Sequence, residues 1–352
     1  MRKGALALCV ALALLACAGC SRRERIERRI ALTDGAAQTD AVLDTVELAG
    51  LGDAYTLSQA LEKMGLSARQ AQVYAADGRI VQASCDQVKI DLYGDVWAAD
   101  ERMQEVAGIL LNPPARANRD AYTDALKTLK AGGRVLLLFI DGLGLDTYEA
   151  ARAQGRIPNL SRMRAERAAG VYPTITPVNY AAMVTGQSPD KTGVRKRGDH
   201  EIACRTLFDE AKDLGLRSRV VEGDQEMLAL SCPQLLNPDA DGDGYTDGEV
   251  FDSAMRCIET DAPDLLFAHF HGVDDASHRT GPRSDEVYAR LRQIDAYAGA
   301  LMDAWDGAVV ALADHGQHEA ENAQGSSRAG EHGAFRASDL LVPFLTLEEG
   351  TI

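Results

Sequence analysis

A continuous apolar run that ends at an acidic residue and a glycine constrains this chain most strongly. Residues 134–140 read Arg-Val-Leu-Leu-Leu-Phe-Ile and are followed by Asp141 and Gly142. The run shows no alternation of apolar and polar positions, so it predicts a strand buried on both faces, as in a parallel sheet. Further strands are expected at 169–172, 219–222, 265–270 and 308–313, with helices between them. This alternation predicts an α/β fold with a mostly parallel sheet flanked by helices.

The part of the chain before this region predicts a small N-terminal α+β module. Residues 57–65 have helical spacing and a terminal glycine, and 73–75, 80–82 and 88–92 have the composition of short strands. Residues 112–118, with two consecutive prolines, are the expected linker. No catalytic motif lies in this module, so an accessory fold is the simplest interpretation, with a spacer or a substrate-facing lid as alternatives.

The first twenty residues have the features of an export signal. Arg2 and Lys3 precede an apolar run at 5–16, which is too short to span a bilayer. Ala18-Gly19-Cys20 resembles the lipobox of bacterial lipoprotein precursors, with Cys17 as a second choice and an ordinary secretory signal as the alternative. We therefore expect 1–20 to be a lipoprotein signal peptide, 21–118 a basic tether and the small module, and 119–352 the catalytic domain. Cys20 would anchor the exported protein to a bacterial membrane at the cell envelope.

The overall charge limits the class of partner. The formal net charge is −16, so no broad basic surface is available for duplex nucleic acid. A small phosphate ester is still compatible with this net charge, because bound metal ions would make the local charge of the binding site positive. The sequence does not indicate an oligomeric state.

Four cysteines lie outside the export segment: Cys85, Cys204, Cys232 and Cys257. An even number in an oxidising compartment is compatible with disulfides, and a Cys204–Cys232 pair is the preferred prediction. Free buried thiols are the alternative. Since no two of these cysteines have CxxC spacing, a thiolate metal site is not expected.

Six carboxylate or imidazole side chains stand in short glycine-flanked contexts, and the list is Asp141, Asp274, His278, Asp314, His315 and His332. This mixture of oxygen and nitrogen ligands suits two Zn²⁺ or similar divalent ions. Asp141, Asp274 and Asp314 each follow closely on a predicted strand, and ligands gather at the carboxyl ends of strands in such sheets. Asp274 and His278 are four residues apart, so on a helix they share one face.

A hydroxyl group is the candidate nucleophile. Pro177 suits the first position of a helix, which makes Thr176 its expected N-cap. A role as helix N-cap would by itself be enough to explain a threonine at position 176. The six candidate ligands favour catalysis instead, because a metal ion can activate a threonine hydroxyl that is otherwise a poor nucleophile.

These motifs resemble the alkaline phosphatase superfamily, and most closely its type I phosphodiesterase/nucleotide pyrophosphatase branch. The family's Pro-Thr-x-Thr-x-x-Asn motif matches 173–179, Asp-x-x-x-His-x-x-Gly-Pro matches 274–282, Asp-His-Gly matches 314–316 and the late His-Gly matches 332–333. The resemblance implies an alkaline-phosphatase-like core. It also implies that one ion is bound by Asp274, His278 and His332, and a second by Asp141, Asp314 and His315 with Thr176. The implied reaction is hydrolysis of a small phosphate ester through a phosphothreonine.

One position departs from this branch. Its diesterases place an Asn where this chain has Arg197, and an Arg could hold a phosphoryl oxygen bidentately. A doubly charged monoester would gain more from this contact than a diester, so a phosphomonoesterase is the alternative function; a solvated basic patch is the simpler reading of Arg197. The sulfatase signature Cys-x-Pro-x-Arg is absent.

An acidic segment resembles a calcium loop. Asp239, Asp241, Asp243 and Asp247 stand at EF-hand positions one, three, five and nine, but Val250 occupies position twelve. A solvated acidic turn is the alternative. This loop also defines a rival function, a catalytically silent calcium-binding envelope lipoprotein. His269 and His271 lie just before the Asp274 motif and are either supporting residues of the site or core histidines.

Overall fold

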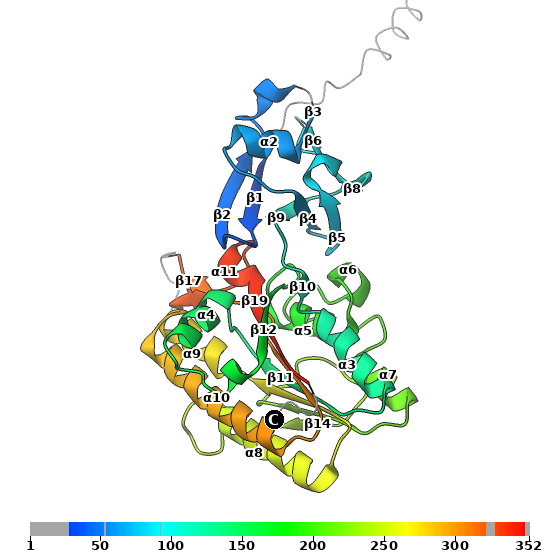
Figure 1. Cartoon of the computed structure of the whole chain (residues 1–352), viewed down its shortest axis with the longest axis vertical. Helices are drawn as coiled ribbons and strands as arrows, with labels where there is room; N and C mark the ends of the chain where they lie inside the picture. The colour runs from blue at the N-terminus through cyan, green and yellow to red at the C-terminus, as the bar shows by residue number, and fades with distance from the viewer. Residues whose placement is uncertain (1–27, 53, 92, 322–327, 349–352) are drawn as a thin grey trace, which may run out of the picture.

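The computed structural model describes residues 28–348 apart from 53, 92 and 322–327 (Figure 1). The export segment and Cys20 lie outside these residues. Within the described part of the chain, no helix combines the length and apolarity needed to cross a bilayer.

An eight-stranded sheet organises the larger part of the molecule (Figure 1). Its strands in spatial order are β10 (Arg116–Ala117), β12 (Arg164–Ala169), β19 (Leu341–Leu347), β16 (Ala308–Leu312), β11 (Val135–Ile140), β15 (Leu265–Phe270), β13 (Ser218–Glu222) and β14 (Gln234–Leu236). Strand β19 is antiparallel to both of its neighbours, and the remaining pairs are parallel. Every residue of β11 is buried, as its unbroken apolar run predicts. The predicted α/β fold with helix-flanked strands is confirmed.

Helices cover both faces of this sheet (Figure 1). One layer contains α3 (Asp120–Lys130), α5 (Thr176–Thr185) and α7 (Leu207–Asp213). The other contains α4 (Leu145–Ala153), α8 (Asp247–Arg256), which continues as the π-helix η4 (Cys257–Asp261), α9 (Gly272–Thr280) and α10 (Asp285–Ala304). Short elements are η3 (Leu160–Arg162), α6 (Pro189–Thr192), α11 (Ala337–Leu340) and the hairpin β17 (His318–Glu319) with β18 (Gly330–Glu331). The apolar side chains between the layers form the main core.

The N-terminal module (residues 29–111) contains two small sheets with their own apolar core. The first has the order β2 (Thr39–Asp44), β1 (Arg29–Asp34), β9 (Val106–Leu111), β4 (Gln70–Ala75) and β5 (Ile80–Ser84). The second has β3 (Ala54–Thr56), β6 (Val88–Asp91), β7 (Val96–Ala98) and β8 (Glu101–Met103). Also present are α2 (Leu57–Lys63), η1 (Ala49–Leu51) and η2 (Cys85–Gln87). The division of the chain at residues 20 and 118 stays a prediction.

The N-terminal module contacts the larger part of the molecule through aromatic side chains. The ring of Tyr74 from β4 lies edge-on to Phe335 with centroids 5.2 Å apart, and Phe335 also contacts Tyr172 at 5.8 Å. The Tyr74 hydroxyl donates to the carbonyl of Gly170 at 3.3 Å. Phe335 follows His332 closely, and Tyr172 precedes the Thr176 helix. The module therefore packs against the two segments that carry candidate site residues.

Two local predictions were wrong, and the expected linker contains a short strand. The strand expected at 169–172 is β12, which ends at Ala169, because it alternates alanines with charged residues and does not stand out as an apolar run. The expected linker contributes β10, which pairs with β12 at the edge of the large sheet. Cys204 and Cys232 are free thiols, as are Cys85 and Cys257, so the preferred disulfide is not formed in this structure.

Candidate active site

The predicted metal ligands come together at the carboxyl ends of three adjacent strands. Asp141 follows β11, Asp314 lies just beyond β16, and Asp274 is in the first turn of α9 after β15. In the sheet these strands have the order β16, β11, β15 and all run parallel. Gly142 allows the close approach of two of these segments, because a Cβ there would lie 2.9 Å from the Cα of Asp274. The strand order thus gathers residues that are far apart in sequence.

The first ligand group consists of Asp141, Asp314 and His315, which offer three ligand atoms within 4.8 Å of one another. His315 Nε2 lies 3.0 Å from Asp314 Oδ2 and 3.6 Å from Asp141 Oδ1. All three residues are buried, and neither of these carboxylate oxygens has a hydrogen-bond partner. Buried, unpartnered carboxylate oxygens beside an imidazole fit a divalent cation, which would satisfy them.

The second ligand group surrounds Asp274. His278 Nε2 lies 3.2 Å from Asp274 Oδ2, and His332 Nε2 lies 3.9 Å from Asp274 Oδ1. The His332 ring also stacks on that of His315, with centroids 3.7 Å apart. The two groups are therefore adjacent, and the structure brings all six predicted ligands together.

The three imidazoles are oriented for metal binding through the same ring nitrogen. His278 Nδ1 lies 2.8 Å from the carbonyl oxygen of Gly330, His332 Nδ1 lies 2.8 Å from that of Thr174, and His315 Nδ1 lies 3.1 Å from that of Gly316. A carbonyl oxygen can only accept, so each Nδ1 carries a proton, and Nε2 is the ring nitrogen that faces the site and can bind a metal ion. Backbone carbonyls commonly fix metal-binding histidines in this way.

Thr176 begins the helix instead of capping it. The N-cap of α5 is Ile175, Thr176 is the first helical residue, and no side chain caps this end. This differs from the predicted cap at Thr176 by one residue. The hydroxyl is therefore free of a capping role, and its Oγ1 lies 3.3 Å from His315 Nε2. Thr176 thus faces the first ligand group from the N-terminus of a helix, where anions are favoured.

A buried amide holds the segment before Thr176. Asn179 Oδ1 accepts from the backbone N–H of Val171 at 2.7 Å, and Nδ2 donates to the carbonyls of Val171 at 3.1 Å and Pro173 at 3.2 Å. Asn118 donates to the same Oδ1 at 2.8 Å. These bonds explain physically why the nucleophile motif contains an Asn three residues after its second Thr.

Burial and neighbouring charges set the protonation states of the site residues. Burial disfavours the charged form of His315, but the neighbouring Asp314 outweighs it and raises the pKa of His315 to about 10. Burial and the charge of His315 lower the pKa of His332 to about 3, so His332 is neutral. Burial opposes ionisation of Asp141, yet hydrogen bonds from His269 and His271 hold its pKa well below the usual range. A cation bound by His315 must therefore displace a proton.

Arg197 lies beside the second ligand group. One of its guanidinium nitrogens is 2.8 Å from His332 Nε2, although the side chain is largely exposed. The segment that carries Arg197 follows α6, after the nucleophile helix. Arg197 therefore lies next to one of the predicted metal ligands.

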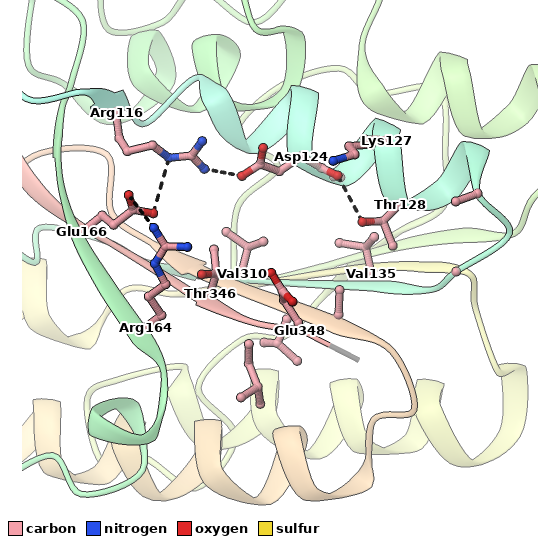
Figure 2. A pocket seen from close by; sticks show the side chains of 16 residues that line it. Arg116, Asp124, Lys127, Thr128, Val135, Arg164, Glu166, Val310, Thr346 and Glu348 are labelled. Atoms are coloured by element: carbon pink, nitrogen blue, oxygen red, sulfur yellow. Dashed lines mark hydrogen bonds and ion pairs between the residues drawn. The ribbon is translucent and has the colours of Figure 1, made fainter. Parts of the chain in front are cut away.

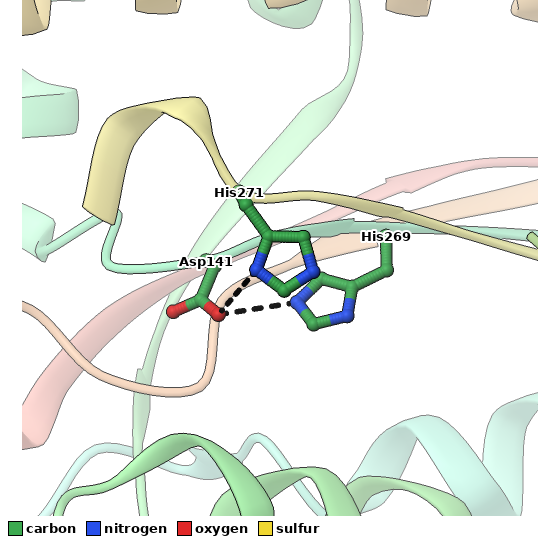
Figure 3. Close-up of side chains that lie close together, drawn as sticks. All are labelled: Asp141, His269 and His271. Atoms are coloured by element: carbon green, nitrogen blue, oxygen red, sulfur yellow. Dashed lines mark hydrogen bonds and ion pairs between the residues drawn. The ribbon is translucent and has the colours of Figure 1, made fainter. Parts of the chain in front are cut away.

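The sequence left the roles of three neighbouring residues open or unassigned. His269 Nε2 and His271 Nδ1 lie 3.1 Å and 3.5 Å from Asp141 Oδ2, as Figure 3 shows. Gln317 donates a hydrogen bond to Asp274 Oδ1. The alternation of His269 and His271 along a strand was the available signal for the histidines, whereas no local pattern singled out Gln317.

The acidic loop differs from the expected calcium geometry. Asp239, Asp241 and Glu249 offer ligand atoms within 4.8 Å of one another. Asp243 Oδ2 instead pairs with Arg290 at 3.0 Å, and the buried Asp247 accepts from the backbone at the end of β15. Only two of the four predicted aspartates thus belong to this group, because α8 begins at Asp247 and turns that side chain inward.

A cavity of about 640 Å³ lies away from these residues (Figure 2). It is lined by the first residues of β11 and β16, the strand ends opposite to Asp141 and Asp314. Arg116 pairs with Asp124, and Arg164 pairs with Glu166 at 3.3 Å. Its charged groups pair with one another, and it lies at the amino ends of these strands, opposite to the predicted metal ligands. We therefore assign this cavity no catalytic role.

Parts of this chain are similar in sequence to known proteins. The sequence profile of the family described as type I phosphodiesterase / nucleotide pyrophosphatase matches residues 135–198 and 215–330. GPI ethanolamine phosphate transferase 2 of Yarrowia lipolytica (strain CLIB 122 / E 150) is 34% identical over 93 residues, 24% of this chain and 11% of that protein. The chain thus spans a small part of this curated relative.

Solved structures with a related fold include a phosphonoacetate hydrolase from Sinorhizobium meliloti 1021 and a murine ectonucleotide pyrophosphatase / phosphodiesterase 5. The first is 20% identical with a TM-score of 0.44 and covers 55% of this chain and 58% of its own. The second is 14% identical with a TM-score of 0.49 and covers 60% of this chain and 87% of its own.

Proposed function

Because the chain belongs to the type I phosphodiesterase / nucleotide pyrophosphatase family, a family of phosphoric ester hydrolases, we propose that it hydrolyses phosphodiester or pyrophosphate bonds with two divalent metal ions. The observation that carries the proposal is the convergence of six ligand side chains beside one threonine hydroxyl. Asp141, Asp314 and His315 would bind one ion, and Asp274, His278 and His332 the other. Zinc suits these oxygen and nitrogen ligands.

Thr176 is the proposed nucleophile. Its oxygen attacks phosphorus and forms a phosphothreonine while the leaving alcohol or phosphate departs; water then hydrolyses the phosphothreonine and restores the hydroxyl. When bound, the ions would promote loss of the hydroxyl proton and neutralise charge on the phosphoryl oxygens. The N-terminus of α5 favours the negative charge of the bound group. Asn179 keeps the Thr176 segment in position through its backbone bonds.

Replacement of the nucleophile tests this proposal. We expect Thr176→Ala to abolish hydrolysis of bis-nitrophenyl phosphate, with an unchanged melting curve and bound metal retained, because the hydroxyl is not a helix cap. Thr185→Ala is the matched control, since it removes a hydroxyl from the other end of the same helix. Turnover near the wild-type rate in Thr176→Ala would exclude the phosphothreonine route.

A phosphomonoester substrate is the alternative for the same residues. Arg197, 2.8 Å from His332 Nε2, supports it, because a guanidinium favours a doubly charged phosphoryl group. Relative rates on mono- and bis-nitrophenyl phosphate distinguish the two substrates. A catalytically silent calcium-binding protein would hydrolyse neither ester and would bind calcium without a tightly held transition metal.

A transferase is a second candidate with the same first step. The likeness to a GPI ethanolamine phosphate transferase favours it. In a transferase, an acceptor hydroxyl would take the phosphoryl group from Thr176 in place of water. Product analysis with and without an added alcohol tests this candidate: a transferred ester would support it, and free phosphate ester products in both samples would favour hydrolysis.

The proposed location is the cell envelope, through lipidation of Cys20 after removal of the signal peptide. Ala18-Gly19-Cys20 supports it. Labelled palmitate should be incorporated into the wild-type protein and not into Cys20→Ala. Equal labelling of Cys17→Ala and wild type would assign the modification to Cys20, whereas no labelling of the wild type would leave a soluble secreted protein.

A further inference from the structure

A third set of metal-binding side chains shares Asp141 with the first ligand group. Asp141 Oδ2 lies 3.1 Å from His269 Nε2 and 3.5 Å from His271 Nδ1 (Figure 3). The ligand atoms of these three residues all lie within 4.8 Å of one another. Ligands bound tetrahedrally at about 2.0–2.1 Å from zinc are about 3.3 Å apart. The observed spacing therefore fits ligands of a single ion.

The two oxygens of Asp141 face different partners. Oδ1 lies 3.6 Å from His315 Nε2 and has no hydrogen-bond partner, whereas Oδ2 faces His269 and His271. A carboxylate with this orientation can bind one cation through each oxygen. An ion held by the two histidines would therefore not compete with an ion held by Asp314 and His315.

A buried carboxylate lies behind the His269 imidazole. Glu222 is fully buried, and its Oε1 has no hydrogen-bond partner and lies 3.7 Å from His269 Nδ1. A second buried carboxylate, Asp247, holds the backbone at His271: its Oδ1 accepts from the His271 N–H at 3.0 Å, while its Oδ2 has no hydrogen-bond partner. Unpaired buried carboxylates are costly, and metal-binding histidines commonly donate their second N–H to a carboxylate. A cation in front of His269 would account for Glu222 and would offset the negative charge of Asp247.

We propose that Asp141, His269 and His271 bind a third divalent transition metal ion, of which zinc is the best suited. Two imidazoles and one carboxylate favour zinc or cobalt over magnesium or calcium, which prefer oxygen ligands alone. The ion would fix the orientation of Asp141 through Oδ2. The His271 side chain is 21% exposed, so an ion can enter from that side. The proposal does not depend on the ester reaction.

Metal content of the purified protein tests this site. After dialysis against zinc, elemental mass spectrometry should give three ions per wild-type chain and two in His271→Asn. His200→Asn, which removes an exposed imidazole from a loop, and Asp241→Ala, which alters the acidic loop, should each retain three. Because the readout is bound metal, inactivity on phosphate esters would count against the proposed function and not against this site.

If His271→Asn fails to fold, anomalous diffraction of the wild-type protein at the zinc absorption edge tests the same site without a variant. A peak of density between Asp141 Oδ2 and the two imidazoles of the wild-type protein is expected. Two ions per wild-type chain with no peak there, or three ions in both wild type and His271→Asn, would overturn the proposal. The histidines would then act as hydrogen-bond donors that position Asp141.

Discussion

Asn179 offers a sharp test of how the segment before Thr176, the proposed nucleophile, is held. Replacement by Ala removes the partner of the Val171 N–H at 2.7 Å, of the Val171 carbonyl at 3.1 Å and of the Asn118 amide at 2.8 Å. The Pro173 carbonyl keeps a second partner, because the N–H of Ile175 also donates to it at 2.9 Å. The Asn118 amide likewise keeps a second partner, the carbonyl oxygen of Asp314 at 3.5 Å. The variant therefore leaves two buried polar groups, the N–H and the carbonyl of Val171, without this partner.

The expected loss of stability follows from these groups. A buried polar group without a partner costs roughly 1–3 kcal/mol, so two of them predict a loss of about 2–4 kcal/mol once partial relaxation is allowed. At roughly 2–4 °C for each kcal/mol in a large domain, the melting temperature should fall by about 4–16 °C. The rate of ester hydrolysis should fall as well, because Val171 and Pro173 lead directly into the Thr176 helix.

Thermal unfolding followed by circular dichroism measures this effect. Thr185→Ala is the control within the same helix; its hydroxyl donates to the Ala181 carbonyl, which keeps its place in the helix, so a shift of only a few degrees is expected. A melting temperature for Asn179→Ala within about 2 °C of wild type would refute the reasoning, since water or rearranged backbone would then satisfy the two groups.

Three further outcomes are expected. Arg197→Ala should lower kcat/KM for mono-nitrophenyl phosphate by about tenfold or more, because a charge-assisted hydrogen bond to the phosphoryl group is lost. The loss for bis-nitrophenyl phosphate should be smaller. Equal losses for the two esters would show that Arg197 has no role in substrate choice. Burial raises the pKa of the Cys232 thiol to about 12, so iodoacetamide at pH 8 should label it at least about 100-fold more slowly in the folded than in the unfolded chain; equal rates would contradict this burial. Calcium should raise the melting temperature of wild type and not of Asp241→Ala, and the absence of a shift in wild type would remove calcium from the acidic loop.

The sequence predicted those parts of the fold and site that depend on local patterns. The unbroken apolar run of β11 required burial on both faces, and the motifs around Asp141, Asp274 and Asp314 stood next to strand ends that the pattern located well. The prediction displaced β12, in which alanines are mixed with charged residues, and it missed the antiparallel β19. Neither has a pattern that sets it apart without its neighbours in the sheet.

The sequence by itself determined which residue types are available for metal binding and the order in which they occur along the chain. Only the tertiary structure decided which atoms meet: that Asp141 divides its two oxygens between His315 and the pair His269 and His271, and that the N-terminal module packs on Phe335. These contacts join segments more than a hundred residues apart. Strand order and the docking of the two cores determine them, and no local periodicity carries that information.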